Sequence, residues 1–275
     1  MPEGDTVWRA AHHLDEALAG RVLTSTDFRV PRFATVDLAG ETVREVVSRG
    51  KHLLLRTDQH SVHSHLKMEG SWHLYKPETM RRGKIRRPGH TIRAIVWTDE
   101  WVAVGFSLGV IEVLSREDED SAVGHLGPDV LDPEFDRDLA LANLATEPDI
   151  SVFVALHDQR KLAGFGNEYV NELLFLARLD PRTPVRDADL APVVDRGVKL
   201  INANRDRIER SFTGSIRPGQ MHWVFGRTQR PCQRCGTPIH ETALGRLPTQ
   251  ERRVYWCPRC QPPASAGPAS GGRDV

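Results

Sequence analysis

The chain lacks the features that would place it in a membrane or export it. No apolar run reaches the ~20 residues of a membrane span, and the first residues lack the basic-then-apolar pattern of a signal peptide. Its 37 Lys and Arg balance 37 Asp and Glu, and zero net charge at first argues against a polyanionic partner. We therefore expect a globular cytoplasmic protein with one large or two medium domains and an accessory element.

The zero net charge conceals charges that are segregated along the chain. Residues 196–260 carry 13 Lys and Arg against 4 Asp and Glu, and a second basic run, KPETMRRGKIRR, covers 76–87. Residues 112–149 hold 12 carboxylates and only two arginines. A run of like charge is usually a solvated face, but two basic regions around an acidic middle fit a protein that binds a polyanion on one side.

Hydrophobic periodicity divides the chain into a β-rich part and a helical part. An amphipathic helix is expected over 5–20, followed from about 21 to 115 by several short strands, a pattern typical of a β-sandwich or barrel. A stretch with two prolines at 124–136 is expected to connect two domains. Helices are then expected over 136–145, 151–164, 167–181 and 187–212, and the low-complexity residues 261–275 should be disordered.

All four cysteines lie near the end of the chain, as two Cys-x2-Cys pairs that enclose 21 residues. Four thiolates from two tight turns form a closed tetrahedral zinc site with no position for a substrate, so the zinc would be structural. Two disulfides or a redox pair are the alternatives, but a cytosolic chain disfavours the first and the lack of a βαβ pattern the second. The predicted ligands are Cys232, Cys235, Cys257 and Cys260, and the hairpin between the pairs would present Arg246, Arg252 and Arg253 to phosphates.

The N-terminus places a proline and a carboxylate side by side. Removal of Met1 would turn Pro2 into a free secondary amine next to Glu3, a pairing suited to attack on an aldehyde or sugar carbon. An α-amino group has a pKa near ~7.7–8.0, so more of it is neutral at physiological pH than of a lysine. One dipeptide does not carry this interpretation alone.

The segment LAGFGNEY at 162–169 is open to two interpretations. Asn167 stands where a helix N-cap belongs, and it either only caps the helix or binds a phosphate at the free helix N–H groups, which Gly164 and Gly166 would leave accessible. The segment lacks the third glycine of a dinucleotide site, so no organic cofactor is expected.

Three basic or polar positions in the β-rich part are also ambiguous. Lys51 begins an apolar strand, where most lysines only guard a strand end. His63 and His65 alternate along one strand and could share a face as a metal pair, although such histidines are more often plain polar strand positions.

Seven motifs follow one another along nearly the whole chain: MPEG, RGKHLLL around Lys51, HLKMEG at 65–70, LGPDVLDP at 126–133, LAGFGNEY at 162–169, PCQRCGTPI, and RRVYWCPRCQ. Together they make the chain resemble the DNA glycosylases that include formamidopyrimidine-DNA glycosylase and endonuclease VIII. Any one motif is modest, but their order and spacing are highly specific.

The resemblance implies an α+β multidomain fold with DNA bound in a cleft between domains. The expected parts are an N-terminal β-sandwich domain with an N-terminal helix over 1–125, a helical domain with a helix-two-turns-helix over 126–225, a zinc hairpin over 226–261, and a tail over 262–275. Proteins of this family remove damaged bases and then cleave the strand by β,δ-elimination. One structural zinc, damaged DNA as partner and a monomeric state are the corresponding expectations.

The resemblance also implies roles for individual residues. Pro2 matches the nucleophile and Glu3 the proton donor, which must start protonated and should therefore have a raised pKa. Lys51 matches the lysine that assists β-elimination, and Arg252 the arginine that helps complete δ-elimination. Asn167 matches a phosphate-binding asparagine, which favours its functional interpretation. Further DNA contacts are expected at Lys67, Met68, His90, His125 and Arg253.

The expected lesion is an oxidised pyrimidine, because Gly4 and the YWC before the second cysteine pair match endonuclease VIII. The segment FSLGVIEV at 106–113 also lacks the arginine-and-phenylalanine pair of the branch that removes oxidised purines. Three departures stand out: Asp5-Thr6 replaces the frequent Pro-Glu, His125 replaces a DNA-contacting arginine, and the zinc hairpin is longer than usual. The alternatives are an oxidised-purine glycosylase, a non-catalytic damaged-DNA-binding protein of the same fold, and a zinc-ribbon transcription or RNA-binding factor.

Overall fold

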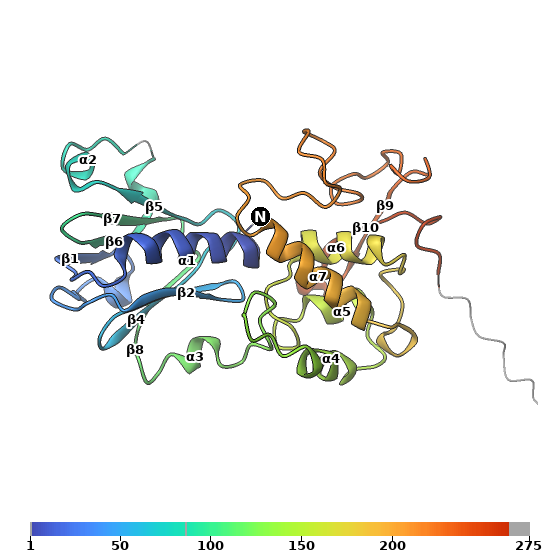
Figure 1. Cartoon of the computed structure of the whole chain (residues 1–275), viewed down its shortest axis with the longest axis horizontal. Helices are drawn as coiled ribbons and strands as arrows, with labels where there is room; N and C mark the ends of the chain where they lie inside the picture. The colour runs from blue at the N-terminus through green and yellow to red at the C-terminus, as the bar shows by residue number, and fades with distance from the viewer. Residues whose placement is uncertain (1, 86, 264–275) are drawn as a thin grey trace, which may run out of the picture.

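The N-terminus lies at the junction of two parts that sit side by side along the molecule (Figure 1). The computed structural model describes residues 2–85 and 87–263. The tail expected to be disordered was 261–275: residues 264–275 lie outside the described residues, and the expectation is wrong for Gln261, which is fully buried and bonded to Cys257 and Leu179. Because both parts meet at the N-terminus, both can position the first residues of the chain.

The first part is a β-sandwich of two four-stranded antiparallel sheets, as the sequence predicts. One sheet has the order β1-β6-β7-β5 and the other β2-β3-β4-β8. The strands are β1 (Ser25–Phe28), β2 (Glu45–Arg49), β3 (His52–Arg56), β4 (His60–His65), β5 (Ser71–Tyr75), β6 (Ile92–Trp97), β7 (Val102–Phe106) and β8 (Val110–Ser115).

Helix α1 (Gly4–Leu18) packs on the sandwich, chiefly against β2 and β3. Its apolar residues recur every three or four positions and so share one face. Val7, Ala11, Leu14 and Leu18 are all buried, in one core with residues of both sheets. This confirms the amphipathic helix and fixes its N-terminal end at the junction (Figure 1).

The second part is helical, with one apolar core shared by its main helices. These are α4 (Arg137–Ala145), α5 (Val152–His157), α6 (Asn167–Leu176) and α7 (Ala191–Asn204). In α6 every residue from Asn167 to Phe175 is buried. Polar side chains on this helix must therefore find partners inside the protein.

Three helices are shorter than the sequence predicts: α5, α6, which ends at Leu176 instead of 181, and α7. Local polar contacts explain the ends of α5 and α7. Helix α5 ends at His157 instead of continuing to 164; the Asp158 carboxylate accepts the N–H of Arg160 at 3.1 Å, and Gly164 has φ +110°. Helix α7 ends at Asn204 instead of 212, because its side chain exchanges two hydrogen bonds with the backbone of Ser211, at 3.1 and 3.3 Å. The residues after α7 therefore form a loop.

The C-terminal hairpin pairs β9 (His240–Leu244) with β10 (Arg252–Trp256). It is tied to α6, since the Tyr255 N–H donates to Asn171 Oδ1 at 2.6 Å.

Short helices that the sequence did not suggest are α2 (Pro77–Arg81), α3 (Asp120–Val123), η1 (Pro31–Phe33), η2 (Gly89–Thr91), η3 (Val185–Asp187) and η4 (Pro248–Gln250). No helix in the described part of the chain is both long and apolar enough to span a membrane.

Candidate active site

The first turn of α1 is inserted against the loop that precedes α6. The Gly4 N–H donates to the Gly164 carbonyl oxygen at 3.0 Å. A Cβ atom on Gly4 would lie 2.9 Å from that oxygen and 3.0 Å from the Gly164 Cα, so a larger residue would have to displace backbone. Gly4 thus holds Pro2 and Glu3 at the junction, with Pro2 half-buried and Glu3 fully buried.

The Glu3 carboxylate sits on the N-terminal end of α6. It accepts the N–H groups of Gly166 at 2.9 Å, Glu168 at 2.8 Å and Tyr169 at 3.4 Å. Burial raises the pKa of Glu3, and this outweighs the lowering by nearby cations and by the Glu168 N–H. The raised pKa confirms the direction predicted for a proton donor.

This contact corrects the prediction made for the start of α6. Gly166, not Asn167, is the N-cap residue, and the Glu3 carboxylate occupies N–H groups that a phosphate was expected to use. Asn167 is the first helical residue, only 8% exposed, and its Oδ1 accepts from Asn171 Nδ2 at 3.2 Å. A phosphate held by those helix amides is therefore excluded, and a DNA contact by Asn167 stays a prediction about its side chain.

The position of the Glu3 carboxylate depends on the absence of a side chain at residue 166. A Cβ there would lie 2.4 Å from Glu3 Cδ and 2.6 Å from its Oε1, although the Gly166 backbone itself is ordinary extended. We expect Gly166→Ala to displace the carboxylate and slow base excision about 10²-fold in single-turnover assays, the cost of roughly 1 Å of misplacement. Gly89→Ala, where a Cβ meets nothing within 4 Å, is the control, and wild-type excision by Gly166→Ala would contradict the expectation.

Lys51 lies in the turn between β2 and β3, at the same junction. The preceding Gly50 has φ +57°, and its N–H donates to Asp129 Oδ2 at 2.6 Å. Burial lowers the pKa of Lys51. The Glu3 carboxylate partly offsets this lowering, and the charge of Arg252 adds to it. Three of the residues expected to be catalytic thus share one electrostatic environment, and a lysine with a lowered pKa is a better base at neutral pH.

Asp5 and Thr6, the departure from the family pattern, are part of a buried ion-pair cluster. Asp5 is 2% exposed and pairs with Arg210 of the loop after α7, which also pairs with Glu168. A second acidic group, Asp5, therefore lies at the junction together with Glu3. Sequence reasoning missed Arg210, because no local pattern marks a contact between residues 205 positions apart.

The residues expected to contact DNA divide into an exposed group and a buried one. Met68 is 64% exposed, and Lys67, in the same turn after β4, has φ 53° and donates its N–H to His65 Nδ1 at 2.9 Å. His90, His125 and Arg253 are also exposed. Asn167 alone among them is buried. Their DNA contacts stay predictions, and the exposed ones are placed where a ligand can reach them.

His63 and His65 do not form a metal pair. His63 lies between two other partners, His52 Nδ1 at 2.8 Å from its Nε2 and Glu112 Oε2 at 2.9 Å from its Nδ1. Glu112 comes from the neighbouring strand β8. Within the described residues, the four cysteines are the single group of three or more candidate ligands close enough to share a metal ion.

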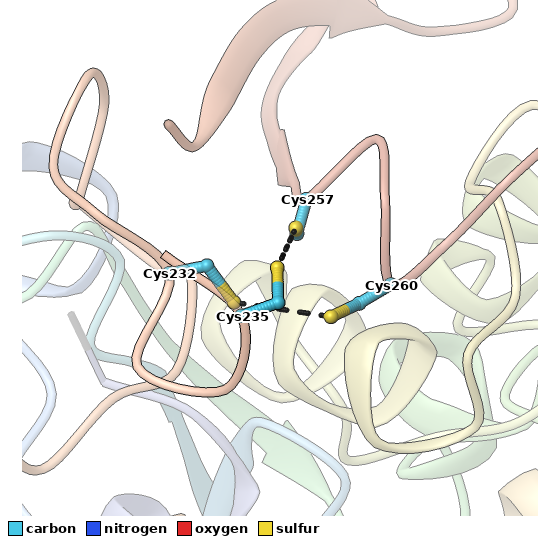
Figure 2. A group of neighbouring side chains, drawn as sticks. All are labelled: Cys232, Cys235, Cys257 and Cys260. Carbon is cyan, nitrogen blue, oxygen red and sulfur yellow. Dashed lines mark hydrogen bonds between the residues drawn. The ribbon is translucent and has the colours of Figure 1, made fainter. Parts of the chain in front are cut away.

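The four cysteine sulfurs converge at the base of the hairpin (Figure 2). All lie within 4.8 Å of one another, with Cys232 Sγ 4.0 Å from Cys260 Sγ and Cys235 Sγ 3.5 Å from Cys257 Sγ. A disulfide needs about 2.05 Å between its sulfurs, so the alternative of two disulfides is wrong. The group could bind one metal ion.

The hairpin arginines do not act as one set. Arg246 pairs with Glu147, and with Asp158 at 3.1 Å, so it binds the hairpin to the helical part instead of facing a phosphate. Arg252 and Arg253 are exposed, and Arg253 lies 3.5 Å from Glu241. The prediction of three phosphate-facing arginines is therefore wrong for Arg246.

Sequence comparison finds known families over most of the chain. The profile of the formamidopyrimidine-DNA glycosylase N-terminal domain matches residues 1–102, and that of the formamidopyrimidine-DNA glycosylase H2TH domain matches 126–194. The "Probable endonuclease 8 2" of Streptomyces coelicolor is 50% identical over 99% of this chain and 98% of its own length. The "DNA-(apurinic or apyrimidinic site) lyase Nei2" of Mycolicibacterium smegmatis is 47% identical over 95% of this chain and 99% of its own length.

Structure comparison finds the same fold. A Lactococcus lactis Fpg mutant, solved in complex with DNA containing Fapy-dG, matches with a TM-score of 0.75 and 23% identity, over 95% of this chain and 100% of the other. At this identity the match shows the fold alone.

Proposed function

The chain belongs to the formamidopyrimidine-DNA glycosylase family, and we propose from this membership that it is a bifunctional DNA glycosylase and AP lyase of base excision repair. The observation that carries the proposal is the Glu3 carboxyl group, buried, with a raised pKa, directly after Pro2. A raised pKa favours the protonated carboxyl group, which can donate a proton as the neighbouring amine attacks.

The first step is expulsion of the damaged base. The target nucleotide must leave the helical stack before its sugar can be reached. With Met1 removed, the Pro2 nitrogen attacks C1′, the bond from C1′ to the base breaks, and Glu3 gives its proton to the departing base. The C1′–O4′ bond then breaks as the proton of the Pro2 nitrogen passes to O4′, which opens the sugar and leaves an iminium ion between Pro2 and C1′. The Glu3 carboxylate is held by the α6 N–H groups.

The second step is strand cleavage by elimination. The iminium ion draws electrons from the sugar and acidifies its C2′ hydrogen. Lys51, with its lowered pKa, assists removal of that proton and loss of the 3′ phosphate. Arg252, exposed on β10, assists loss of the 5′ phosphate in δ-elimination. Hydrolysis by water releases the opened sugar fragment from Pro2.

We assign zinc to the four-cysteine site, in a structural role. A tetrahedron with metal–sulfur bonds of about 2.3 Å has sulfur–sulfur edges of about 3.8 Å, between the 3.5 and 4.0 Å found here. With all four positions filled by sulfur, the metal has no place for a substrate.

Oxidised pyrimidines are the proposed lesions. Gly4 and the absence of the purine-branch residues at 106–113 support this choice, and so do the relatives named endonuclease 8 at 46–50% identity. The proposed partner is damaged DNA, duplex or single-stranded, and the proposed protein is a cytoplasmic monomer that associates with the nucleoid through DNA.

Borohydride trapping tests the function directly. The processed chain should form a covalent adduct, seen as a slower band on a denaturing gel, with duplexes that contain an abasic site or an oxidised pyrimidine. A chain that retains Met1 has an amide at the Pro2 nitrogen and should form none. Binding without an adduct from the processed chain would overturn the proposal in favour of a non-catalytic damage-binding protein, and faster trapping on an oxidised purine would reverse the lesion assignment.

A further inference from the structure

Arg210 is a buried cation at the junction, in the loop between α7 and the hairpin. Its side chain is 9% exposed. Nε donates to Asp5 Oδ2 at 2.6 Å and Nη2 to Asp5 Oδ1 at 2.8 Å, a bidentate pair. Nη2 also donates to Thr6 Oγ1 at 2.5 Å, and Nη1 to Glu168 Oε2 at 2.6 Å.

These contacts join three segments that are far apart in the sequence. Asp5 and Thr6 belong to the first turn of α1, directly after Pro2 and Glu3. Glu168 belongs to the first turn of α6, and its own N–H holds the Glu3 carboxylate at 2.8 Å. One guanidinium group therefore binds both the helix that carries the nucleophile and the helix that holds the proton donor.

A second set of contacts closes the cluster around Arg210. The Tyr169 hydroxyl donates to Asp5 Oδ2 at 2.9 Å, and the guanidinium carbon lies 5.8 Å from the centre of the Tyr169 ring. His222 Nε2 lies 2.8 Å from Glu168 Oε1. Asp5, Glu168 and Tyr169 are all less than 9% exposed, so water has little access to replace Arg210 as their hydrogen-bond partner.

The need for an arginine at this position follows from its geometry. Two buried carboxylates, Asp5 and Glu168, share this cation. Glu168 also contacts His222, but loss of the guanidinium group would take from Asp5 its bidentate cationic partner in a poorly solvated site. A lysine would restore the charge but has one donor atom, so it cannot hold the bidentate pair and the third partner together.

We propose that Arg210 is a positioning residue for base excision: it holds the first turn of α1 against the first turn of α6 and so keeps Pro2 and the Glu3 carboxyl group in place at the N-terminal end of α6. It touches neither the damaged base nor the sugar in this role. The inference rests on the proposed function of Pro2 and Glu3, and it gives Asp5-Thr6 a role, since these residues supply the anchor on α1.

The test is single-turnover kinetics of Arg210→Lys on two duplexes, one with an oxidised pyrimidine and one with a preformed abasic site. We expect excision of the base to slow about 10²-fold, as for a misplaced catalytic group, and cleavage at the abasic site, which needs no proton from Glu3, to slow less. A single-turnover rate constant does not depend on the folded fraction, so simple destabilisation would not change it. Excision at the parent rate would overturn the inference.

Two further variants separate positioning from general stability. Arg182→Lys is the matched control, because Arg182 also makes a bidentate pair with a buried carboxylate, Asp180, and lies over an aromatic ring, that of Trp256, outside the junction. It should excise at the parent rate. Arg210→Ala should regain excision when guanidinium ion is added, and no gain in the folded variant would count against the inference.

The inference and the proposed function fail in different ways. If the processed parent chain forms no borohydride adduct, the proposed function fails. If the parent forms the adduct and Arg210→Lys excises as fast as the parent, only the role of Arg210 fails.

Discussion

Replacing Glu3 by Gln should slow release of the damaged base by about 10²–10⁴-fold, the usual contribution of a general acid, and leave cleavage at a preformed abasic site nearly intact. Gln has the same shape and keeps one oxygen for the α6 N–H groups, but its amide protons are not acidic enough to be transferred to the leaving base. Base release is followed by chromatography and cleavage at the abasic site by denaturing gel, and only base release should be strongly slowed. Equal loss of both steps would contradict the assignment of Glu3 as the acid.

The same variant should change the pH dependence. The pKa of Glu3 is raised above its ordinary 4.5 by burial, so the acid is protonated below the raised pKa and is lost as pH rises through it. Excision by the parent should fall over that range. In Glu3→Gln this limb of the profile should be missing. For stability the sign is the same: the folded protein holds this proton more tightly than the unfolded chain, so the contribution declines as pH rises above 4.5.

Glu172→Gln is a matched control for both effects. Glu172 is also a fully buried carboxylate on α6 whose pKa is raised by burial, and it accepts three backbone N–H groups, from Trp223 at 2.8 Å, Val224 at 2.9 Å and Phe225 at 2.8 Å. Glu172→Gln should change the pH dependence of stability in the same direction as Glu3→Gln does. It should leave single-turnover excision unchanged, since the partners of Glu172 lie outside the junction of α1 and α6.

Removal of the metal is the second change that we expect to reduce DNA binding and strand cleavage strongly. Structural zinc contributes about 10–16 kcal/mol of apparent binding free energy in isolated zinc-finger peptides, and in this hairpin the described elements around it are a short two-stranded ribbon and a small apolar cluster. We expect Cys257→Ser, or exhaustive chelation, to unfold the hairpin and strongly weaken DNA binding and strand cleavage. Elemental analysis should give about one zinc per chain in the parent.

The zinc hairpin and the residues after it contact α6 and the turn that follows α6. The Tyr255 N–H donates to Asn171 Oδ1 of α6 at 2.6 Å, and Gln261 Nε2 donates to the carbonyl of Leu179, just past the end of α6, at 2.9 Å. Cys257→His keeps a zinc-binding side chain and should retain part of the activity that Cys257→Ser loses. A metal-free protein with full activity would refute the structural role.

Sequence patterns predicted the elements that depend on local chemistry. The face of α1 that bears Val7 and Leu14, the β-sandwich and the cysteine cluster all follow from periodicity, strand composition or ligand spacing. The same patterns failed where side chains capped or ended an element. Asn204 stopped α7 eight residues before the expected end at 212, through a contact with Ser211 that helical periodicity does not encode.

The candidate site divides in the same way. Pro2, Glu3 and Lys51 could be found from sequence, because short motifs surround them and the chemistry of an amine beside an acid is local. Where the Glu3 carboxylate binds could not, since its partners are N–H groups more than 160 residues away, and they were expected to hold a phosphate. Met68 and Arg252 were named from sequence as well, but only folding shows that both are exposed.

By itself, the sequence determined the family, and it predicted the reacting residues and the four-cysteine cluster, because each depends on residue types at short spacing. Only the tertiary structure decided how MPEGDT is used: Gly4 fits against Gly164, Glu3 caps α6, and Asp5 and Thr6 hold Arg210. The physical reason is burial. Charges at the junction of two parts of the protein are stable only when paired, and folding alone brings residues 5, 168 and 210 close enough to pair.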